Sequence, residues 1–216
     1  MKSKQVCCGP LEIPRGLPGA VIFDMDGTLV DTMPVHFRAW KAALKEEDAE
    51  HAFPEEKFYR YGGRSAMDIL TEMKEEFGFD FDPMMVARSK RAHYLKLVEG
   101  QVPIIREVLD YLEWARCNRV PCAVATGSTS VIAAKTLKAV ELTKHFECVV
   151  TPADVSKGKP DPEMFLLAAE QLGVDPSDCV VFEDAEPGIQ AALAAGMKVV
   201  QVPRVPSQQS GERVAN

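Results

Sequence analysis

A short, continuous apolar run near the start of the chain ends abruptly in charged residues. Residues 20–23 read Ala-Val-Ile-Phe, and Asp24-Met-Asp26-Gly27-Thr28 follows. Such a run, bounded by glycine, predicts a buried strand with two carboxylates at its carboxyl end. Ligands of open parallel sheets bind at that end. Because buried acids are costly unless a cation or a reaction uses them, the segment indicates chemistry rather than packing.

Between residues 34 and 100 the pattern changes to apolar residues at three- and four-residue steps, which predicts helices. The predicted helices span residues 35–44, 54–61, 65–77 and 83–98. Pro54 and Pro83 suit the first turns of two of them. An all-helical segment inserted directly after the first strand predicts a small second domain above the strand tips.

After residue 102, strand-like and helix-like segments alternate. Strands are predicted at residues 121–125, 148–151, 179–182 and 198–202, and helices at 104–116, 130–139, 162–172 and 187–195. Gly173 and Gly196 stand where helix carboxyl ends favour glycine. This alternation predicts an α/β fold, a Rossmann-like, doubly wound parallel sheet with right-handed connections and an inserted small all-helical cap domain.

The predicted domain organisation follows from these patterns. Residues 19–33 and 101–204 form the Rossmann-like catalytic core, and residues 34–100 form the helical cap. Residues 1–18, which are rich in glycine and proline, are expected to be an irregular N-terminal tail, and residues 205–216 a C-terminal tail.

Net charge and the lengths of the apolar runs limit the kinds of partner that the chain could bind. The 216 residues carry a net charge of −7, which argues against nucleic acid but not against a small phosphorylated metabolite. No apolar run approaches the roughly 18 residues of a membrane span. The first residues lack the apolar segment of a signal peptide. We therefore expect a cytoplasmic protein with no nucleic-acid or membrane partner. A monomer is also expected, although these features do not determine the oligomeric state.

The cysteine pattern favours a reducing compartment. The six cysteines are Cys7, Cys8, Cys117, Cys122, Cys148 and Cys179. The last three stand in apolar strand-like runs, where a small buried thiol is expected. Cys7 and Cys8 have no matching pair at zinc-site spacing, so reduced thiols in a cytosolic protein are the simpler interpretation.

Four strand ends, or the segments after them, carry polar residues that would meet at one edge of the sheet. They are Asp24 with Asp26, Thr126 with Gly127 and Ser128, Lys159, and Glu183 with Asp184. Taken alone, each has an ordinary explanation as a turn, a helix cap or a solvated side chain. Their convergence on one edge predicts a shared site.

The acids of this site require a cation. Asp24, Asp26, Glu183 and Asp184 would place up to four negative charges close together, and one lysine cannot balance them. A site of oxygen ligands without histidine or cysteine suits Mg²⁺. The alternative is a buried network of acids around Lys159 that only holds loops together.

The other half of the site suits an anion. Thr126 offers a hydroxyl, and Gly127 and Ser128 offer backbone N–H groups ahead of the predicted helix at residues 130–139. Exposed amides at a helix N-terminus bind phosphate, and Lys159 adds a positive charge. A metal, a hydroxyl, amides and an ammonium around one carboxylate are typical of phosphoryl transfer.

These residues, in this order and spacing, resemble the four motifs of the haloacid dehalogenase superfamily. The helical insertion is similar to the cap of that family, and the chain resembles its β-phosphoglucomutase-like branch. Residues 179–197 are especially similar to fructose-1-phosphate phosphatases. True dehalogenases have a single aspartate in the first motif, so the second one, Asp26, implies an enzyme that transfers phosphoryl groups.

The resemblance implies a role for each core residue. Asp24 attacks phosphorus and forms an aspartyl-phosphate, and Asp26 protonates the leaving alcohol and then activates water. The Asp26 backbone carbonyl also faces Mg²⁺. Thr126 and Lys159 hold the phosphoryl group and orient Asp24. Asp24, Asp26, Glu183 and Asp184 form the metal site.

Substrate choice is expected in the cap, with His36, Arg64 and Lys90 as candidate substrate-binding residues. Each has a structural alternative. His36 could be a partly buried helix residue, Arg64 part of a plain interhelical turn, and Lys90 part of a solvated helix face.

Phosphatase and mutase activity both fit the core motifs. In β-phosphoglucomutases an arginine follows the cap glycine by three residues, whereas here Ala66 stands three residues after Gly63 and Arg64 is displaced. This favours hydrolysis of a hexose phosphate, such as fructose 1-phosphate, over interconversion of β-glucose 1-phosphate and glucose 6-phosphate. A non-catalytic sugar-phosphate sensor would have lost a catalytic residue, and none of the core ones is missing.

Overall fold

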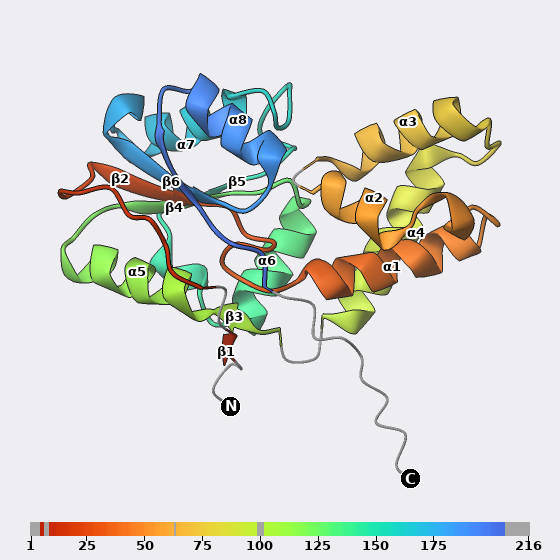
Figure 1. Ribbon diagram of the computed structural model, residues 1–216, viewed down its shortest axis with the longest axis horizontal. Helices are drawn as coiled ribbons and strands as arrows, with labels where there is room; N and C mark the ends of the chain where they lie inside the picture. The colour runs from red at the N-terminus through yellow and green to blue at the C-terminus, as the bar shows by residue number, and fades with distance from the viewer. Residues whose placement is uncertain (1–4, 7–8, 63, 99–101, 206–216) are drawn as a thin grey trace, which may run out of the picture.

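The computed structural model describes residues 5–6, 9–62, 64–98 and 102–205. A twisted sheet with helices on both faces forms one part of the molecule, and helices α1–α4 form the other, beside the sheet (Figure 1). This is the predicted α/β fold with an inserted helical cap.

The main sheet has five strands in the order β5-β4-β2-β6-β7, all parallel. In chain order they are β2 (Ala20–Phe23), β4 (Cys122–Ala125), β5 (Cys148–Val150), β6 (Cys179–Glu183) and β7 (Lys198–Gln201). The central strand β2 pairs with β4 and β6, so the segments that follow these three strands meet at one edge. Order and direction together therefore bring the polar strand ends to one place.

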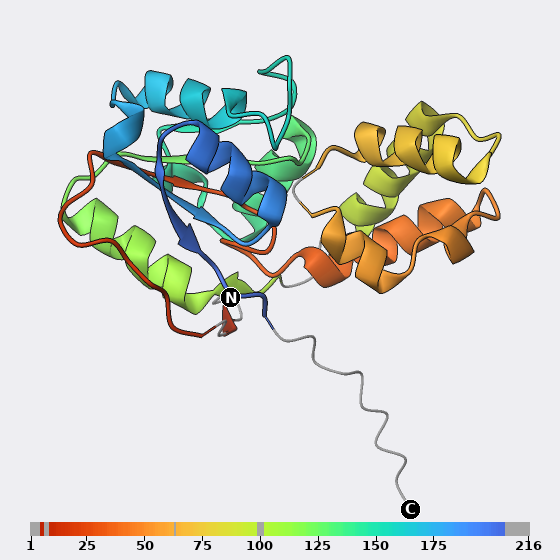
Figure 2. The same cartoon turned by 45° about the horizontal axis from the view of Figure 1, so that its top comes forward.

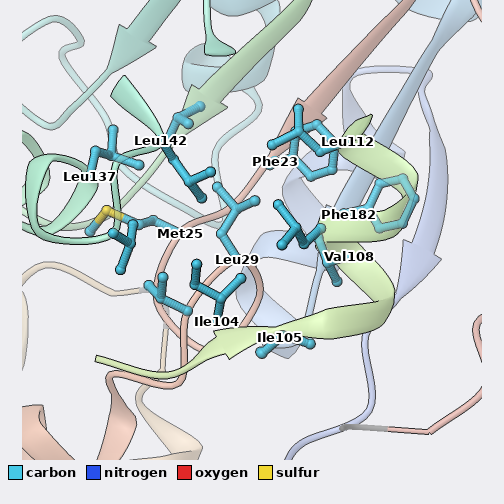
Figure 3. Packing of buried hydrophobic residues seen from close by; sticks show 14 of the residues in the cluster. Phe23, Met25, Leu29, Ile104, Ile105, Val108, Leu112, Leu137, Leu142 and Phe182 are labelled. Atoms are coloured by element: carbon cyan, nitrogen blue, oxygen red, sulfur yellow. The ribbon is translucent and has the colours of Figure 1, made fainter. Parts of the chain in front are cut away.

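Both faces of the sheet are covered because its central strands are apolar on both sides. Helices α5 (Arg106–Cys117) and α6 (Ser130–Ala139) pack on one face, and α7 (Glu163–Leu172) and α8 (Glu186–Ala194) on the other (Figure 1). The side chains of β2 alternate between two hydrophobic clusters accordingly. The larger cluster gathers Phe23, Leu112 and Phe182 between sheet and helices (Figure 3).

The cap has a hydrophobic core of its own. Its elements are α1 (Met33–Lys45), a 3-10 turn (Glu50–Ala52), α2 (Glu55–Arg60), α3 (Ala66–Phe77) and α4 (Pro83–Leu97), gathered beside the sheet (Figure 2). Trp40, Phe53 and Leu70 are among the buried residues of this cluster. Ser65 caps α3 by accepting a hydrogen bond from the Asp68 amide, at 3.2 Å.

The cap contacts the core at several places, two of which lie near the ends of α4 and α2. Tyr94 near the end of α4 belongs to the core cluster, and its hydroxyl lies 3.0 Å from Oγ1 of Thr136 on α6. At the other place, Arg204 donates to the backbone carbonyl of Tyr59 at 3.1 Å. These contacts place the cap helices against the polar edge of the sheet.

Two local predictions were wrong. Ile104–Ile105, expected in a helix, form strand β3, because Ile105 donates to the Leu29 carbonyl and the pair aligns with β1 (Gln5–Val6). Strand β1 in turn lies within the N-terminal segment that was expected to be irregular. Pairing between segments a hundred residues apart cannot be inferred from local periodicity.

The described cysteines do not form disulfides, and their burial differs from the prediction at one position. Cys122 and Cys179 are buried, whereas Cys148 is only half-buried because it lies on the edge strand β5. Cys7 and Cys8 lie outside the described residues. Among the helices that the structure describes, none is both long and apolar enough to cross a membrane.

Candidate active site

Lys159 and Asp24 form the buried centre of the site. The ammonium lies 2.6 Å from Asp24 Oδ1, 2.7 Å from Glu183 Oε2 and 3.0 Å from the Ala125 carbonyl. These contacts use all three N–H donors of the lysine. Burial alone lowers the pKa of Lys159, but the two carboxylates outweigh it, so the pKa lies above its usual value. The lysine is therefore a fixed positive charge that orients Asp24.

Glu183 is fixed through both of its oxygens. Oε2 accepts from Lys159, and Oε1 accepts from the backbone N–H groups of Asp184 and Ala185, at 3.1 and 3.0 Å. Gly188 makes room for this side chain, because a Cβ there would lie 2.0 Å from Glu183 Oε2. A glycine in the first turn of α8 thus leaves room for a side chain of the site.

Asp184 is close to Asp24 and also contacts the first loop. Its Oδ1 accepts a hydrogen bond from the Thr28 hydroxyl at 3.1 Å. Gly27 has a φ of +92°, and a Cβ there would lie 2.7 Å from Asp184 Oδ2. Only glycine combines that backbone conformation with so close an approach.

Asp24, Glu183 and Asp184 form a cluster that fits a divalent cation. Each offers a carboxylate oxygen, and these oxygens lie within 4.8 Å of one another. Burial, followed by repulsion from Glu183, raises the pKa of Asp24 and raises that of Asp184 to about 7. With all three acids ionised, the negative charge exceeds that of Lys159 by two, and a hard, oxygen-preferring cation would balance this excess.

Asp26 is surrounded by donors. Its Oδ1 accepts from Thr32 at 2.6 Å and from His36 at 3.0 Å, and its Oδ2 accepts from Ser128 at 2.7 Å. The Thr126 hydroxyl contacts Oδ2 more weakly, at 3.4 Å. Burial alone raises the pKa of Asp26, but His36 and these hydrogen bonds outweigh it and hold the pKa below its usual value. The two aspartates of the first motif thus have opposite environments.

His36 and Lys90 continue this network into the cap. Both are buried, and the Lys90 ammonium lies 2.9 Å from His36 Nδ1. Lysine can only donate, so Nδ1 accepts and the neutral imidazole carries its proton on Nε2, facing Asp26. Burial and the charge of Lys90 lower the pKa of His36, which favours that neutral form. Burial lowers the pKa of Lys90 to about 8.

This arrangement differs from a solvated helix face. The alternative for Lys90 was a position on such a face. Its ammonium is instead buried above Trp40 and Tyr94, with the ring centroids at 5.5 and 5.8 Å. His36 stacks on Tyr94 at 4.1 Å. His36 therefore contacts Asp26, and Lys90 contacts His36. Direct contact of either residue with the substrate stays a prediction.

The predicted anion-binding segment has one of its amides already engaged. The Ser128 N–H donates to Thr126 Oγ1 at 3.0 Å, and the Ser128 hydroxyl donates to Asp26. Gly127 lies between them, half-buried. The segment is thus brought to Asp26 as predicted, whereas its contact with phosphate stays a prediction.

Arg64 lies away from this network. Its guanidinium pairs with Glu72 Oε2 at 2.8 Å and stacks over the Tyr61 ring at 4.9 Å. Ala66 is the first residue of α3. Gly63 lies outside the described residues.

Thr32 contacts the site although the sequence pattern did not predict this. It precedes α1 and would be interpreted as a helix cap, but its hydroxyl makes no cap hydrogen bond and donates to Asp26 instead. Thr28 was noted only as part of the first motif, and its bond to Asp184 joins that motif to the fourth. The sequence signal that could have indicated Thr32 is its helix-cap position a few residues after the aspartate pair.

The chain is similar to known proteins over most of its length. The family described as haloacid dehalogenase-like hydrolase matches residues 21–202. Fructose-1-phosphate phosphatase YqaB of Escherichia coli is 38% identical over 182 residues, which cover 84% of this chain and 95% of the relative. β-Phosphoglucomutase of Bacillus subtilis is 33% identical over 190 residues, covering 85% and 82%.

A solved structure gives the same result. A hydrolase from Pseudomonas syringae superimposes with a TM-score of 0.76 at 29% identity, covering 84% of this chain and 82% of that one. The resemblance inferred from the four motifs is thus confirmed over nearly all of the described chain. This protein belongs to the haloacid dehalogenase-like hydrolase family.

Proposed function

We propose that the protein is a magnesium-dependent phosphatase that hydrolyses a small sugar phosphate, a hexose phosphate such as fructose 1-phosphate. The observation that carries this proposal is the pairing of two unlike aspartates at the end of β2. Asp24 is oriented through one oxygen by Lys159, and among the described residues its Oδ2 accepts no hydrogen bond. Asp26 is held as a carboxylate by several donors.

These environments suit two different tasks in one reaction. Asp24 attacks phosphorus, the bond to the sugar oxygen breaks, and the sugar leaves with a proton from Asp26. Asp26, now ionised, takes a proton from water, whose oxygen attacks phosphorus and displaces the Asp24 carboxylate. Inorganic phosphate and the sugar are the products.

The surroundings of Asp26 support mainly the second of these steps, because they favour its ionised form. For the first step Asp26 must acquire a proton, and the N–H group of His36 Nε2 is 3.0 Å away. We propose His36 and Lys90 as positioning residues for Asp26. Thr126, Gly127 and Ser128 are proposed to hold the phosphoryl group together with Lys159.

Asp24, Glu183 and Asp184 are the proposed magnesium ligands, joined by the backbone carbonyl of Asp26. Bound magnesium would supply positive charge that neutralises the phosphoryl oxygens and keeps Asp24 ionised. Residues 34–100 are proposed to act as a cap over a core of residues 19–33 and 101–204. We also propose that the protein is a cytoplasmic monomer and that its substrate is a small phosphorylated metabolite.

The mutase is the second candidate, because a β-phosphoglucomutase is 33% identical to this chain. Hydrolysis is favoured by the greater identity to a fructose-1-phosphate phosphatase, 38%. The uncharged Ala66 also stands where the mutases would have their arginine.

A phosphate-release assay over hexose, pentose and polyol phosphates tests the proposal. We expect release from at least one hexose phosphate with Mg²⁺ and none after treatment with EDTA, with activity restored by added Mg²⁺. Equal release with and without the metal would contradict the metal dependence. Conversion of β-glucose 1-phosphate to glucose 6-phosphate without net phosphate release would assign the mutase instead.

Replacing Lys90 by methionine is expected to stabilise the protein and slow the reaction. Burial of the charged lysine corresponds to about 3 kcal/mol at neutral pH, since the pKa falls from 10.5 to about 8. Loss of the hydrogen bond to His36 offsets part of this, so the free energy of unfolding should rise by about 1–2 kcal/mol. Because Lys90 no longer fixes the His36 tautomer, kcat should fall roughly tenfold or more.

The stability difference between wild type and the Lys90 variant is expected to change with pH in a defined direction. Between pH 8 and 10.5 the unfolded chain binds a proton at Lys90 and the folded one does not, so wild-type stability rises with pH relative to the variant. Urea unfolding at pH 7 and 10 measures this, with Lys96→Met on the exposed face of α4 as the control. A variant less stable than wild type at pH 7 would contradict the prediction.

A further inference from the structure

An open cavity of about 400 Å³ lies between the cap and the core. Residues of α2, α3 and the turn between them line it on the cap side, and Pro187 lines it on the core side. Pro187 is three residues after Asp184. Gly62 of the same turn also faces the core there, because a Cβ on it would lie 3.5 Å from Cβ of Ala185.

Two cations of this cavity are already paired with carboxylates. Arg64 contacts Glu72 Oε2 at 2.8 Å, and Lys57 contacts Glu76 Oε2 at 2.5 Å. Arg60, a third cation in the lining, is exposed at the end of α2. The charge that could attract an anion is therefore largely neutralised at the two paired positions.

Glu72 is the central residue of this cluster. Its second oxygen, Oε1, accepts a hydrogen bond from the Tyr61 hydroxyl at 2.5 Å, while the Arg64 guanidinium stacks over the Tyr61 ring. Both hydrogen bonds lower the pKa of Glu72, so it stays ionised. One carboxylate thus fixes the positions of both Tyr61 and Arg64.

We propose that Glu72 determines specificity by holding Arg64, so that the cavity accepts the neutral, hydroxyl-bearing end of a sugar monophosphate and rejects a second phosphate. The inference rests on the proposed function and deepens it. Hydroxyl groups can exchange hydrogen bonds with carboxylates, guanidinium and phenol alike. A dianionic phosphate would have to compete with Glu72 for Arg64 and lie beside Glu76. Such a repulsive element is an established way to reject the wrong partner.

The test compares affinities for fructose 1,6-bisphosphate and inorganic phosphate by calorimetry with Mg²⁺. Both probes occupy the phosphoryl site, but only the bisphosphate has a second phosphate that can enter the cavity. The affinity for the bisphosphate divided by that for inorganic phosphate therefore measures how well the cavity accepts a second phosphate. Glu72→Gln should raise the ratio roughly tenfold by releasing Arg64. The Glu72 side chain is 43% exposed, so the amide is expected to leave the fold intact.

Two further variants separate the proposed cause from others. Glu72→Gln combined with Arg64→Gln should return the ratio to the wild-type value. Glu75→Gln removes one charge from the same helix outside the cavity and should leave the ratio unchanged. An unchanged ratio in Glu72→Gln, a gain that survives loss of Arg64, or an equal gain in Glu75→Gln would each overturn the inference.

Failure of the proposed function would be visible separately. If the wild-type protein released phosphate from no sugar phosphate, the phosphatase proposal would fail, while the calorimetric ratio would still test Glu72. Conversely, a wild-type phosphatase that binds fructose 1,6-bisphosphate much more tightly than fructose 1-phosphate would overturn the inference about Glu72 alone.

Discussion

Asp24→Asn is expected to lower kcat for phosphate release by about four orders of magnitude or more while the protein stays folded. An amide cannot attack phosphorus as a carboxylate does. The neighbouring groups would nevertheless remain in place, because Lys159 keeps its contacts with Glu183 and the Ala125 carbonyl. Removal of one of three buried acids also relieves repulsion, which in the absence of metal favours the fold.

Two measurements check this result. Steady-state phosphate release gives the loss of activity, and mass spectrometry of the quenched reaction should detect a phosphorylated chain in wild type and none in the variant. Asp31→Asn is a matched control, because Asp31 lies in the same loop outside the acidic cluster. A folded Asp24→Asn protein with near-normal turnover would show that the nucleophile is another group.

Lys159→Met is expected to lower the free energy of unfolding by about 3–5 kcal/mol in metal-free buffer. The ammonium is buried and touches two carboxylates, so its removal leaves Asp24, Glu183 and Asp184 without a compensating charge. Excess Mg²⁺ should restore part of the loss, since an ion that binds only the folded state stabilises it by mass action. Activity should be lost with or without the metal.

Urea unfolding with EDTA and with Mg²⁺ measures this change. Lys157→Met is the control, because Lys157 is two residues away and its side chain is 73% exposed, so its replacement should change stability by less than about 0.5 kcal/mol. Equal effects of the two substitutions would contradict the buried ion network. Absence of any Mg²⁺ effect on the Lys159 variant would argue against a metal site at the three acids.

The central part of the site could be predicted from sequence because its information is local. The apolar run at residues 20–23 indicates a buried strand, and the alternation after residue 102 indicates a parallel sheet, which brings the carboxyl ends of its strands to one edge. Asp24, Lys159 and Glu183 all end or follow parallel strands and therefore lie at the same edge of the sheet. No knowledge of side-chain packing was needed to place them together.

The surroundings of Asp26 could not be predicted in this way. His36 and Lys90 are 54 residues apart in the chain and meet only because α1 and α4 pack together. The segment Ser89-Lys90-Arg91 has the local pattern of a solvated helix face. Burial of Lys90 follows from the position of α4 against the core, which Tyr94 and Thr136 fix.

The sequence by itself therefore determined the fold class, the order of the motifs and the acids that gather around Lys159. The tertiary structure alone decided which donors surround Asp26, and that Arg64 is paired with Glu72 rather than directed at an anion. The physical reason is the range of the interactions. Periodicity and strand direction follow from neighbouring residues, whereas the pairing of side chains depends on how loops and helices pack in three dimensions.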